Sequence, residues 1–457
     1  MSNSKPQMKI KQNGFQRRLS ISLAGAQGGL RLLSNRATSV LLPEEEKRKA
    51  HKYALAKEAK IFAAKLGQLK GAYVKIGQMM ALYGDHFLPK EITAALHELE
   101  HKTSSLDWSM IEPAINKSLG SKHKDLLIEK KAMAAASLAQ VHRARDRKSN
   151  KELCIKVQYP GVANTIEADF NAVLQMLKFG RWVQSGRDIE AWMIEIKAML
   201  VDEADYQREL EMTRKVAKLL SGDTRYLVPK VEKKYSGEHV ITMNYLDGFE
   251  VTHQAISKLS QIRRNAIAKA MLEIFFKEVF EWGIMQTDPN FGNYRIQLRS
   301  SSEENDKLIL LDFGAVRELD KQFMQALRST IVSAFKNDTE GVIKSSIELG
   351  CLREAQSASV KESFAAFCIL LMEPFRIDKS AIPAFALNTK NQYKWHDSKL
   401  LIRVAKLGAK SIEIEGFSSP PKEFALIARK LTGVFTFVST LKAEINAHSI
   451  IEQYFKT

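Results

Sequence analysis

The stretch MQTDPNFGN, residues 285–293, places Asp288 and Asn293 five positions apart, with a proline and a glycine between them. It comes just after residues 261–283 (QIRRNAIAKAMLEIFFKEVFEWG), whose apolar residues predict a long helix. A carboxylate and an amide at this spacing can form a simple turn. They can also act as a catalytic base and a metal ligand, because both side chains carry hard oxygen atoms. The neighbouring sequence decides between these two interpretations.

A second acidic motif follows downstream. The runs YRIQL (294–298) and LILLDFGAV (308–316) flank the polar RSSSEENDK (299–307), which predicts a β-hairpin. This hairpin delivers Asp312, Phe313 and Gly314 directly after four apolar strand residues. Asn293 and Asp312 are side chains that suit Mg²⁺, so we predict that they bind a magnesium ion.

A cationic strand residue lies far upstream. Residues 124–161 predict a strand, a small-residue turn, a strand, a charged turn (DRKSNK, 146–151) and a further strand. Lys156 stands between Ile155 and Val157, so it either extends its ammonium to solvent or holds a phosphate group. Residues 161–222 predict helix, and there Glu203 or Glu209 is the candidate partner for the Lys156 cation, with Asp205 nearby.

The order of these parts is that of protein-kinase-like phosphoryl transfer, with Asp288 as base and Lys156 directed at the phosphates. We therefore predict an α+β, protein-kinase-like bilobal fold with an N-terminal helical extension and a helical C-terminal lobe. The predicted ATP-binding residues are Ala134, Ala135, Ala136, Ser137, Lys156, Glu203, Met243 and Tyr245. Three features differ from an ordinary protein kinase. The glycine-rich loop is replaced by AAAS, the catalytic loop has Gln-Thr-Asp instead of His-Arg-Asp, and no Ala-Pro-Glu follows Asp-Phe-Gly.

The chain resembles the UbiB/AarF-type atypical kinases, which support ubiquinone biosynthesis, over roughly residues 60–340. YVKIGQMM (73–80) is similar to the family's Lys-x-Gly-Gln motif, and AAASLAQVH (134–142) to its Ala-rich nucleotide loop. ELCIKVQYPGV (152–162), EAD (203–205) and QTDPNFGN (286–293) resemble its lysine strand, Glu-x-Asp motif and catalytic loop. One difference is Ala139, where family members usually carry glycine.

The resemblance gives the Lys-x-Gly-Gln motif a role that the residues alone do not give. Lys75 and Gln78 fall three apart on a predicted helix, and by themselves such residues are usually solvated. In the family this helix folds over the active site and restrains phosphoryl transfer to protein, and the Glu-x-Asp motif helps to seat it. The resemblance thus implies a regulatory set: Lys75, Gly77, Gln78, Glu203, Asp205 and Glu209.

The 457 residues are long enough for a bilobal protein with an extension. We predict a basic, loosely structured arm at 1–45, a helical extension at 46–122, an N-lobe at 123–247 and a C-lobe at 248–457. Residues 1–75 hold 16 Lys and Arg against 4 acids, which is +12 of the net +17. Such an arm favours phosphate-bearing partners. Few aromatic residues accompany the charges, so an anionic membrane surface is favoured over nucleic acid.

The cellular setting follows from length and composition. No apolar run approaches the roughly 18–20 residues of a membrane span, and no secretory signal is present. We expect a cytoplasmic protein, peripheral to the inner membrane. The acid-free first 43 residues also fit a mitochondrial transit peptide. The oligomeric state stays open.

The predicted function is that of a Mg²⁺-dependent, ATP-binding atypical kinase or ATPase. By resemblance it supports ubiquinone or isoprenoid-lipid metabolism, acting on a small lipid-like substrate or with quinone-synthesis proteins. Two alternatives remain: a nucleotide-switched pseudokinase scaffold for quinone-synthesis enzymes, and a small-molecule kinase of the aminoglycoside-phosphotransferase type. A peptide kinase is disfavoured because no docking segment follows Asp-Phe-Gly.

Overall fold

The computed structural model describes residues 43–69, 71–84, 87–101, 105–179, 182, 189–301, 305–412 and 421–455. The chain divides into two compact units. The first contains the chain up to Glu211 together with Lys230–Tyr245, and the second contains Met212–Pro229 together with the chain from Leu246 onward. Most of the basic arm predicted at 1–45 lies outside the described residues.

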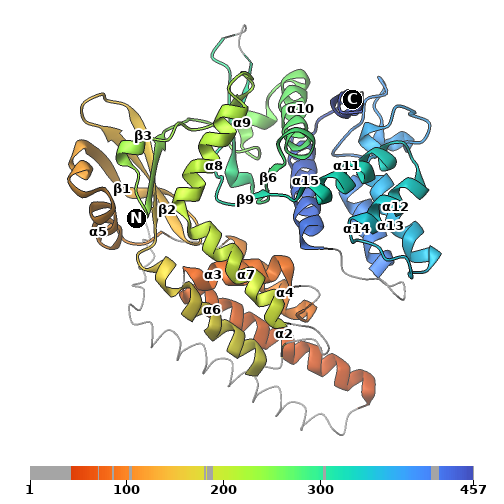
Figure 1. Ribbon diagram of the computed structural model, residues 1–457, viewed down its shortest axis with the longest axis horizontal. Helices are drawn as coiled ribbons and strands as arrows, with labels where there is room; N and C mark the ends of the chain where they lie inside the picture. The colour runs from red at the N-terminus through yellow and green to blue at the C-terminus, as the bar shows by residue number, and fades with distance from the viewer. Residues whose placement is uncertain are drawn as a thin grey trace. The chain divides into compact units, whose positions relative to one another are not determined.

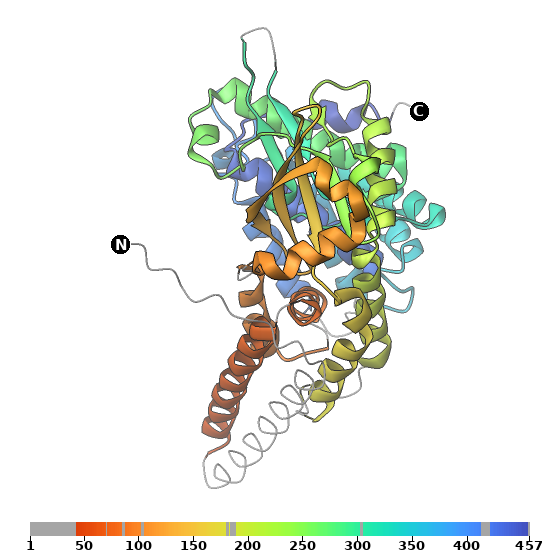
Figure 2. The ribbon, with the colours of Figure 1, turned by 90° about the vertical axis from the view of Figure 1, so that its left-hand side faces the viewer.

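The first unit contains a helical part built on one apolar core. Its helices are α2 (Glu44–Leu69), α3 (Ala72–Tyr83), α4 (Lys90–His97), the short η1 (Glu98–His101), α6 (Val162–Phe179) and α7 (Ile189–Ala204). Figures 1 and 2 show α6 and α7 running side by side, with α2 and α3 in the same bundle. Phe62, Tyr73, Phe170 and Met193 are among the residues buried between these helices.

Within the helical extension predicted at 46–122, the helix that carries Lys75 and Gln78 is separate from the helix before it. The break between α2 and α3 falls at Gly71, which adopts a positive φ of 63° that only glycine tolerates well. The new helix then begins with the amide of Val74 bonded to the carbonyl of Gly71 at 3.1 Å. The apolar periodicity continues through this point, so the pattern alone gave no sign of the break.

The same unit holds a four-stranded antiparallel sheet in the order β1-β2-β3-β5. Its elements are β1 (Leu126–Ala135), β2 (Ala139–Asp146), β3 (Glu152–Gln158) and β5 (Val240–Asn244), with α5 (Trp108–Leu119), η2 (Gly120–Asp125) and η3 (Lys233–Tyr235) beside them. Figure 2 shows α5 lying across the sheet, and the two share an apolar core. The hairpin predicted around DRKSNK is confirmed, with His142 opposite Ile155.

The helical segment predicted at 161–222 consists of three helices, α6, α7 and α8 (Tyr206–Leu219), and α8 begins in the first unit and ends in the second. Asp205 separates α7 from α8. Its carboxylate accepts hydrogen bonds from the amides of Gln207 and Arg208 at 3.0 and 3.1 Å. An aspartate at this position satisfies amides that a new helix leaves without partners, so it marks a helix start.

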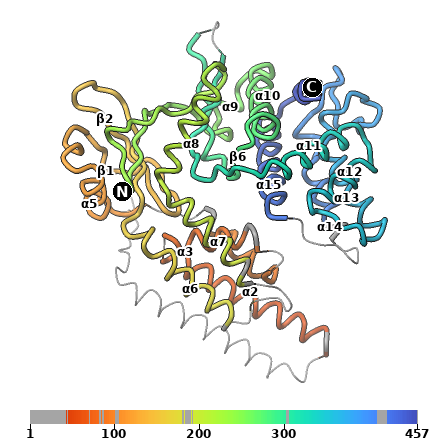
Figure 3. Tube along the Cα trace, in the orientation of Figure 1, coloured from red at the N-terminus to blue at the C-terminus, as the bar shows by residue number. Residues whose placement is uncertain are grey.

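The second unit is mostly helical, as predicted for the C-terminal lobe and tail. Its helices are α9 (Gln254–Ser257), α10 (Gln261–Lys277), the π-turn η4 (Glu278–Trp282), η5 (Phe291–Asn293), α11 (Lys321–Phe335), α12 (Thr339–Glu348), α13 (Ala358–Leu371), η6 (Glu373–Phe375), η7 (Ala384–Ala386), α14 (Leu400–Ile412), α15 (Lys422–Thr440) and α16 (His448–Glu452). Figure 3 traces α15 beside α10, and the two are in contact. None of the helices in the described ranges is long and apolar enough to cross a bilayer.

Two small sheets in this unit carry the motifs. One has the order β4-β8-β7, formed by β4 (Tyr226–Leu227), β8 (Lys307–Leu310) and β7 (Tyr294–Gln297), and the β7–β8 hairpin confirms the prediction. The other pairs β6 (Ile284–Gln286) with β9 (Val316–Glu318). Asn293 therefore directly precedes β7, while Asp312 follows β8, so the hairpin brings these residues back to the same end.

Candidate functional site

Asp288 and Asn293 are held together by a single tight turn in the second unit. Asn293 Nδ2 donates to Asp288 Oδ2 at 3.1 Å and to the Asp288 carbonyl at 3.2 Å. Asn290 supports the turn, because its side chain accepts from the amide of Gly292 at 2.8 Å at the start of η5. The five-residue spacing thus places a carboxylate beside a side-chain amide. The amide nitrogen of Asn293 donates to Asp288, so its oxygen can bind another ligand.

Gln286 connects this turn to the Asp-Phe-Gly motif. Its Oε1 accepts from the amide of Asp288 at 2.8 Å, and its Nε2 donates to the carbonyl of Asp312. Beside it, Thr287 donates through Oγ1 to the carbonyl of Ala315 at 2.8 Å. The sequence has Gln-Thr-Asp in place of His-Arg-Asp, and Gln286 is not among the predicted site residues. The structure shows that this glutamine bridges the two motif loops.

Asn293 and Asp312 line one small cavity together with Gln286 and Tyr294. The amide of Leu311 donates to the carbonyl of Asn293 at 3.0 Å, and Asp312 Oδ1 accepts from the amide of Gly314 at 3.0 Å. Both side chains offer hard oxygen atoms. This donor set fits Mg²⁺, which commonly uses one or two carboxylates and completes its shell with phosphates and water.

A buried ion pair lies behind the turn. Lys430 of α15 is 1% exposed, and its Nζ lies 2.9 Å from Glu278 Oε2 and 3.3 Å from the hydroxyl of Tyr294. Glu278 in turn accepts from the amide of Gln286 at 3.2 Å. Burial raises the pKa of Glu278, and the ammonium of Lys430 opposes that rise. The pair therefore links α15 to β6 at the base of the site.

Replacing Lys430 by methionine is expected to destabilise the second unit by about 3–5 kcal/mol, because Glu278 loses the cation that compensates its burial. In the unfolded chain the pKa of a glutamate is about 4.3, so above this pH Glu278 of the variant must take up a proton when the protein folds. The decrease in the free energy of unfolding therefore grows from pH 5 to pH 8. Denaturant unfolding of Lys430→Met at both pH values measures this. The double variant with Glu278→Leu should recover most of the stability. Equal losses at both pH values would contradict the assignment of a charged pair.

In the first unit, Lys156 pairs with Glu209. Lys156 Nζ lies 2.7 and 2.8 Å from the two carboxylate oxygens, and the Glu209 side chain is 3% exposed. The ammonium also lies 5.5 Å from the centre of the Tyr206 ring. Lys156 comes from β3 and Glu209 from the first turns of α8, so sheet and helix fix the pair from both sides. Of the two candidate partners in the sequence, the structure selects Glu209.

Glu203 pairs instead with Lys75. The Lys75 ammonium of α3 lies 2.6 Å from Glu203 Oε1 near the end of α7, and both side chains are largely buried. Gln78 is not part of this pair, because its Nε2 donates to the carbonyl of Leu99 at 3.1 Å. Gly77 lets this contact form, since a Cβ there would lie 2.5 Å from Leu99 Cδ1. Lys75 and Gln78, three positions apart on α3, thus bind different parts of the first unit.

The predicted alanine loop needs a correction. Ala134 and Ala135 belong to β1, opposite Val141 and Gln140, and the turn starts at Ala136, whose amide donates to the carbonyl of Ala139 at 2.8 Å. The turn is therefore shorter than predicted, with Ala136, Ser137 and Leu138 between the two strands.

The predicted ATP-binding residues Met243 and Tyr245 lie at the end of β5. Met243 is buried in the strand opposite Cys154. Tyr245 follows the strand and donates its amide to the carbonyl of Glu152 at 3.0 Å, and its ring lies 4.2 Å from the Arg143 guanidinium. Their contact with a nucleotide remains a prediction.

Comparison with known proteins agrees with a kinase-like fold and site. The family model of the ABC1 atypical kinase-like domain matches residues 98–346. The mitochondrial atypical kinase COQ8 of Schizosaccharomyces pombe is 30% identical over 402 residues, which are 88% of this chain and 63% of that protein. The COQ8 protein of Saccharomyces cerevisiae is 29% identical over 396 residues, 86% of this chain and 75% of that protein. A solved complex of Mycobacterium tuberculosis Rv3197 with erythromycin gives a TM-score of 0.58 at 21% identity, covering 89% of this chain and 98% of that one.

The fold is therefore that of the atypical kinases, which confirms the predicted α+β, kinase-like class. The chain belongs to the ABC1 atypical kinase-like family, and this confirms the resemblance to the UbiB/AarF type. It spans less than two thirds of the length of the fission yeast relative.

Proposed function

We propose that the protein is a Mg²⁺-dependent, ATP-binding atypical kinase or ATPase. The observation that carries the proposal is the hydrogen-bonded cluster of Asp288, Asn293 and Asp312 in the second unit. Kinase-type phosphoryl transfer needs a carboxylate to accept or orient a hydroxyl, and oxygen ligands for the metal. All three side chains are of the required type and are joined through Gln286 and Leu311.

Each residue has a proposed task. Asp288 accepts the proton of the attacking hydroxyl or water, while Asn293 holds the Asp288 carboxylate in one orientation. Asn293 and Asp312 would hold Mg²⁺, which would supply positive charge that neutralises phosphate oxygens. Lys156 contacts the α- and β-phosphates, and Glu209 keeps its ammonium directed. The Lys75–Glu203 pair fixes α3 to α7 and serves the regulatory role implied by the family.

The proposed purpose is support of ubiquinone or related isoprenoid-lipid metabolism at a membrane surface. The curated relatives are named as mitochondrial atypical kinases, and the family resemblance suggests the quinone connection. The +12 charge of residues 1–75 supports attraction to anionic lipid. The proposed substrate is a small lipid-like molecule or a quinone-synthesis protein, with the protein peripheral to the inner membrane.

Mg²⁺·ATP should stabilise the protein through Lys156. At a ligand concentration of 100 times Kd, the expected gain for wild type is about 2.7 kcal/mol. Lys156→Met should abolish this gain, measured as the ATP-induced rise in Tm relative to each variant's own Tm. The double variant Lys156→Met/Glu209→Leu removes both buried charges and should also fail to respond.

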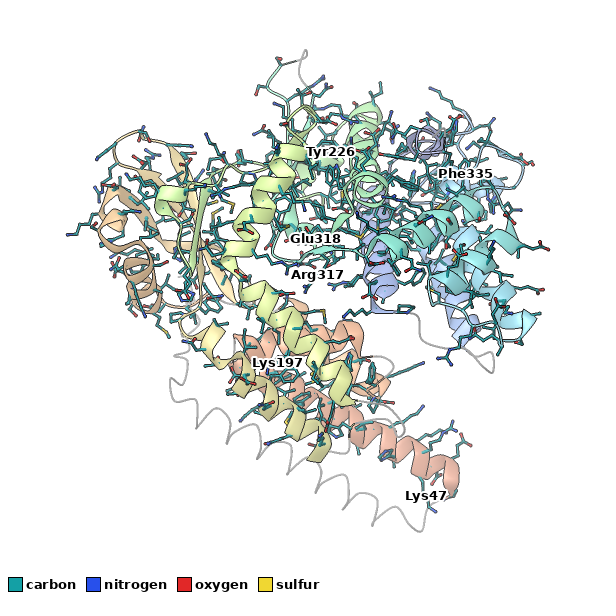
Figure 4. All side chains as sticks on the ribbon, viewed as in Figure 1. Lys47, Lys197, Tyr226, Arg317, Glu318 and Phe335 are labelled. Atoms are coloured by element: carbon teal, nitrogen blue, oxygen red, sulfur yellow. The ribbon has the colours of Figure 1, made fainter. Side chains whose placement is uncertain are left out.

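Lys197→Met is a matched control in the same unit. Lys197, labelled in Figure 4, lies on α7 and pairs with Glu167 at 2.5 Å in a more exposed position. This variant should respond to ATP as wild type does. A wild-type protein that Mg²⁺·ATP does not stabilise, or a Lys156→Met variant with the full response, would contradict the proposed nucleotide site.

A further inference from the structure

Helix α15 lies against the turn of residues 288–293, which we call the catalytic turn. Three of its residues, at the four-residue spacing that shares a helix face, contact that turn. Arg429 reaches Asp288, Gly433 meets Pro289, and Phe437 packs against Phe291.

Arg429 holds the carboxylate oxygen that Asn293 does not. One guanidinium nitrogen of Arg429 lies 3.3 Å from Asp288 Oδ1, while Asn293 Nδ2 bonds Oδ2 at 3.1 Å. Both side chains of the ion pair are about a quarter to a third exposed. The two oxygens of the candidate base are thus bound by donors from opposite sides, which restricts rotation of the carboxylate. Arginine suits this task because its planar guanidinium directs its donors.

Gly433 permits close approach of the turn. A Cβ built at this position would lie 2.1 Å from the Cβ and 3.3 Å from the Cα of Pro289. Pro289 directly follows Asp288, and its ring is too rigid to move aside. Any side chain at position 433 therefore displaces the turn or the helix.

One turn further along α15, Phe437 closes the contact. Its ring meets those of Phe291 and Tyr294 edge-on, each with centroids 5.9 Å apart. Lys430, next to Arg429, fixes the helix from the buried side through Glu278 and Tyr294. The helix is therefore held in place independently of the Arg429 contact.

We propose that Arg429 is a positioning residue for Asp288, and that the face of α15 formed by Arg429, Gly433 and Phe437 sets the geometry of the catalytic turn. This rests on the proposed function for the chemistry, but the positioning itself is a property of the fold. Catalysis depends steeply on such geometry, since a misplacement of about 1 Å can cost on the order of 10²-fold in rate.

The test combines kinetics with hydrogen exchange on the full chain. Arg429→Gln and Gly433→Ala should each lower kcat by about 10–100-fold, while the KM for ATP changes less than about threefold. Arg429→Lys should retain more activity than Arg429→Gln because it keeps the charge. In the same variants, the amides of Asp288, Gly292 and Asn293, which are bonded in the turn, should exchange faster.

Thr432→Ala is the matched control, because Thr432 is exposed and, among the residues that the structure describes, its side chain bonds along its own helix to the carbonyl of Ala428 at 2.8 Å. It should change neither readout. If the wild-type protein hydrolyses no ATP, the proposed function fails. The hydrogen-exchange rates of the turn amides then still test whether Arg429 and Gly433 position the turn. If the turn amides exchange at the wild-type rate in both Arg429→Gln and Gly433→Ala, the proposal is overturned. Faster exchange with unchanged kcat in an active protein would overturn it as well.

Discussion

Asp288→Asn is expected to lower ATP turnover by about 10²–10⁴-fold, the usual contribution of a positioned general base. Asparagine has nearly the same shape and keeps an oxygen that can accept from Asn293, and its backbone amide can still donate to Gln286. The turn should therefore persist, although the ion pair with Arg429 is lost and the side chain is less restricted. Affinity for Mg²⁺·ATP should stay within a few-fold of wild type, because the proposed metal ligands are Asn293 and Asp312. Phosphate release under saturating ATP, together with a nucleotide titration, separates the two effects.

The matched control is Asp320→Asn in the same unit. Asp320 caps α11, where its carboxylate accepts from the amides of Gln322 and Phe323, and asparagine caps helices about as well. This variant should keep wild-type turnover. Wild-type turnover by Asp288→Asn would remove Asp288 from the mechanism and favour the pseudokinase scaffold.

Asp312→Asn is expected to weaken Mg²⁺-dependent ATP affinity by about 100-fold or more, which corresponds to about 2.7 kcal/mol, since it removes the one carboxylate among the two proposed metal ligands. The amide of Gly314 can still donate to the new side-chain oxygen, and Gln286 bonds the backbone carbonyl, so the loop should keep its shape. The substitution therefore removes the negative charge of the Asp312 carboxylate and leaves the loop otherwise intact.

Titration with a fluorescent nucleotide, in Mg²⁺ and in EDTA, measures the effect of Asp312→Asn. Wild type should bind more tightly in Mg²⁺, whereas the variant should bind equally weakly in both. If Asp312→Asn binds Mg²⁺·ATP like wild type, Asp312 is not a metal ligand, and the catalytic turn would have to be assigned another role.

Local patterns predicted the strands and hairpins well. The alternation around Lys156 and the apolar run before Asp312 are short-range signals, because side chains in a strand alternate between its faces. The breaks between helices were harder. Gly71 and Asp205 interrupt runs whose apolar periodicity continues, and each acts through a backbone angle or a cap that periodicity does not encode.

Partner choice among charged residues depends on tertiary packing. In the sequence, Glu203 and Glu209 are equally suitable partners for Lys156, because both lie in a predicted helical segment. The start of α8 at Tyr206 places Glu209 against Lys156, while Glu203 pairs with Lys75. The order of motifs in the sequence could place both glutamates near the site but could not assign them.

Arg429 and Lys430 were missed because their partners are distant in the chain. Arg429 lies 141 positions from Asp288, and Lys430 lies 152 positions from Glu278. The available signal was two adjacent cations within the apolar segment FALIARKLTGVF, residues 424–435. A buried cation in such a helix indicates a buried anion, although only the fold identifies which one.

Mg²⁺-dependent ATP hydrolysis by the purified full chain tests the central claim most directly. The assay compares Mg²⁺ with EDTA, and anionic with neutral vesicles, with Asp288→Asn measured in parallel. We expect hydrolysis that requires Mg²⁺, rises with anionic vesicles and is lost in Asp288→Asn. An absence of hydrolysis under every condition, with ATP still bound, would contradict the assignment of residues 286–293 as a catalytic loop.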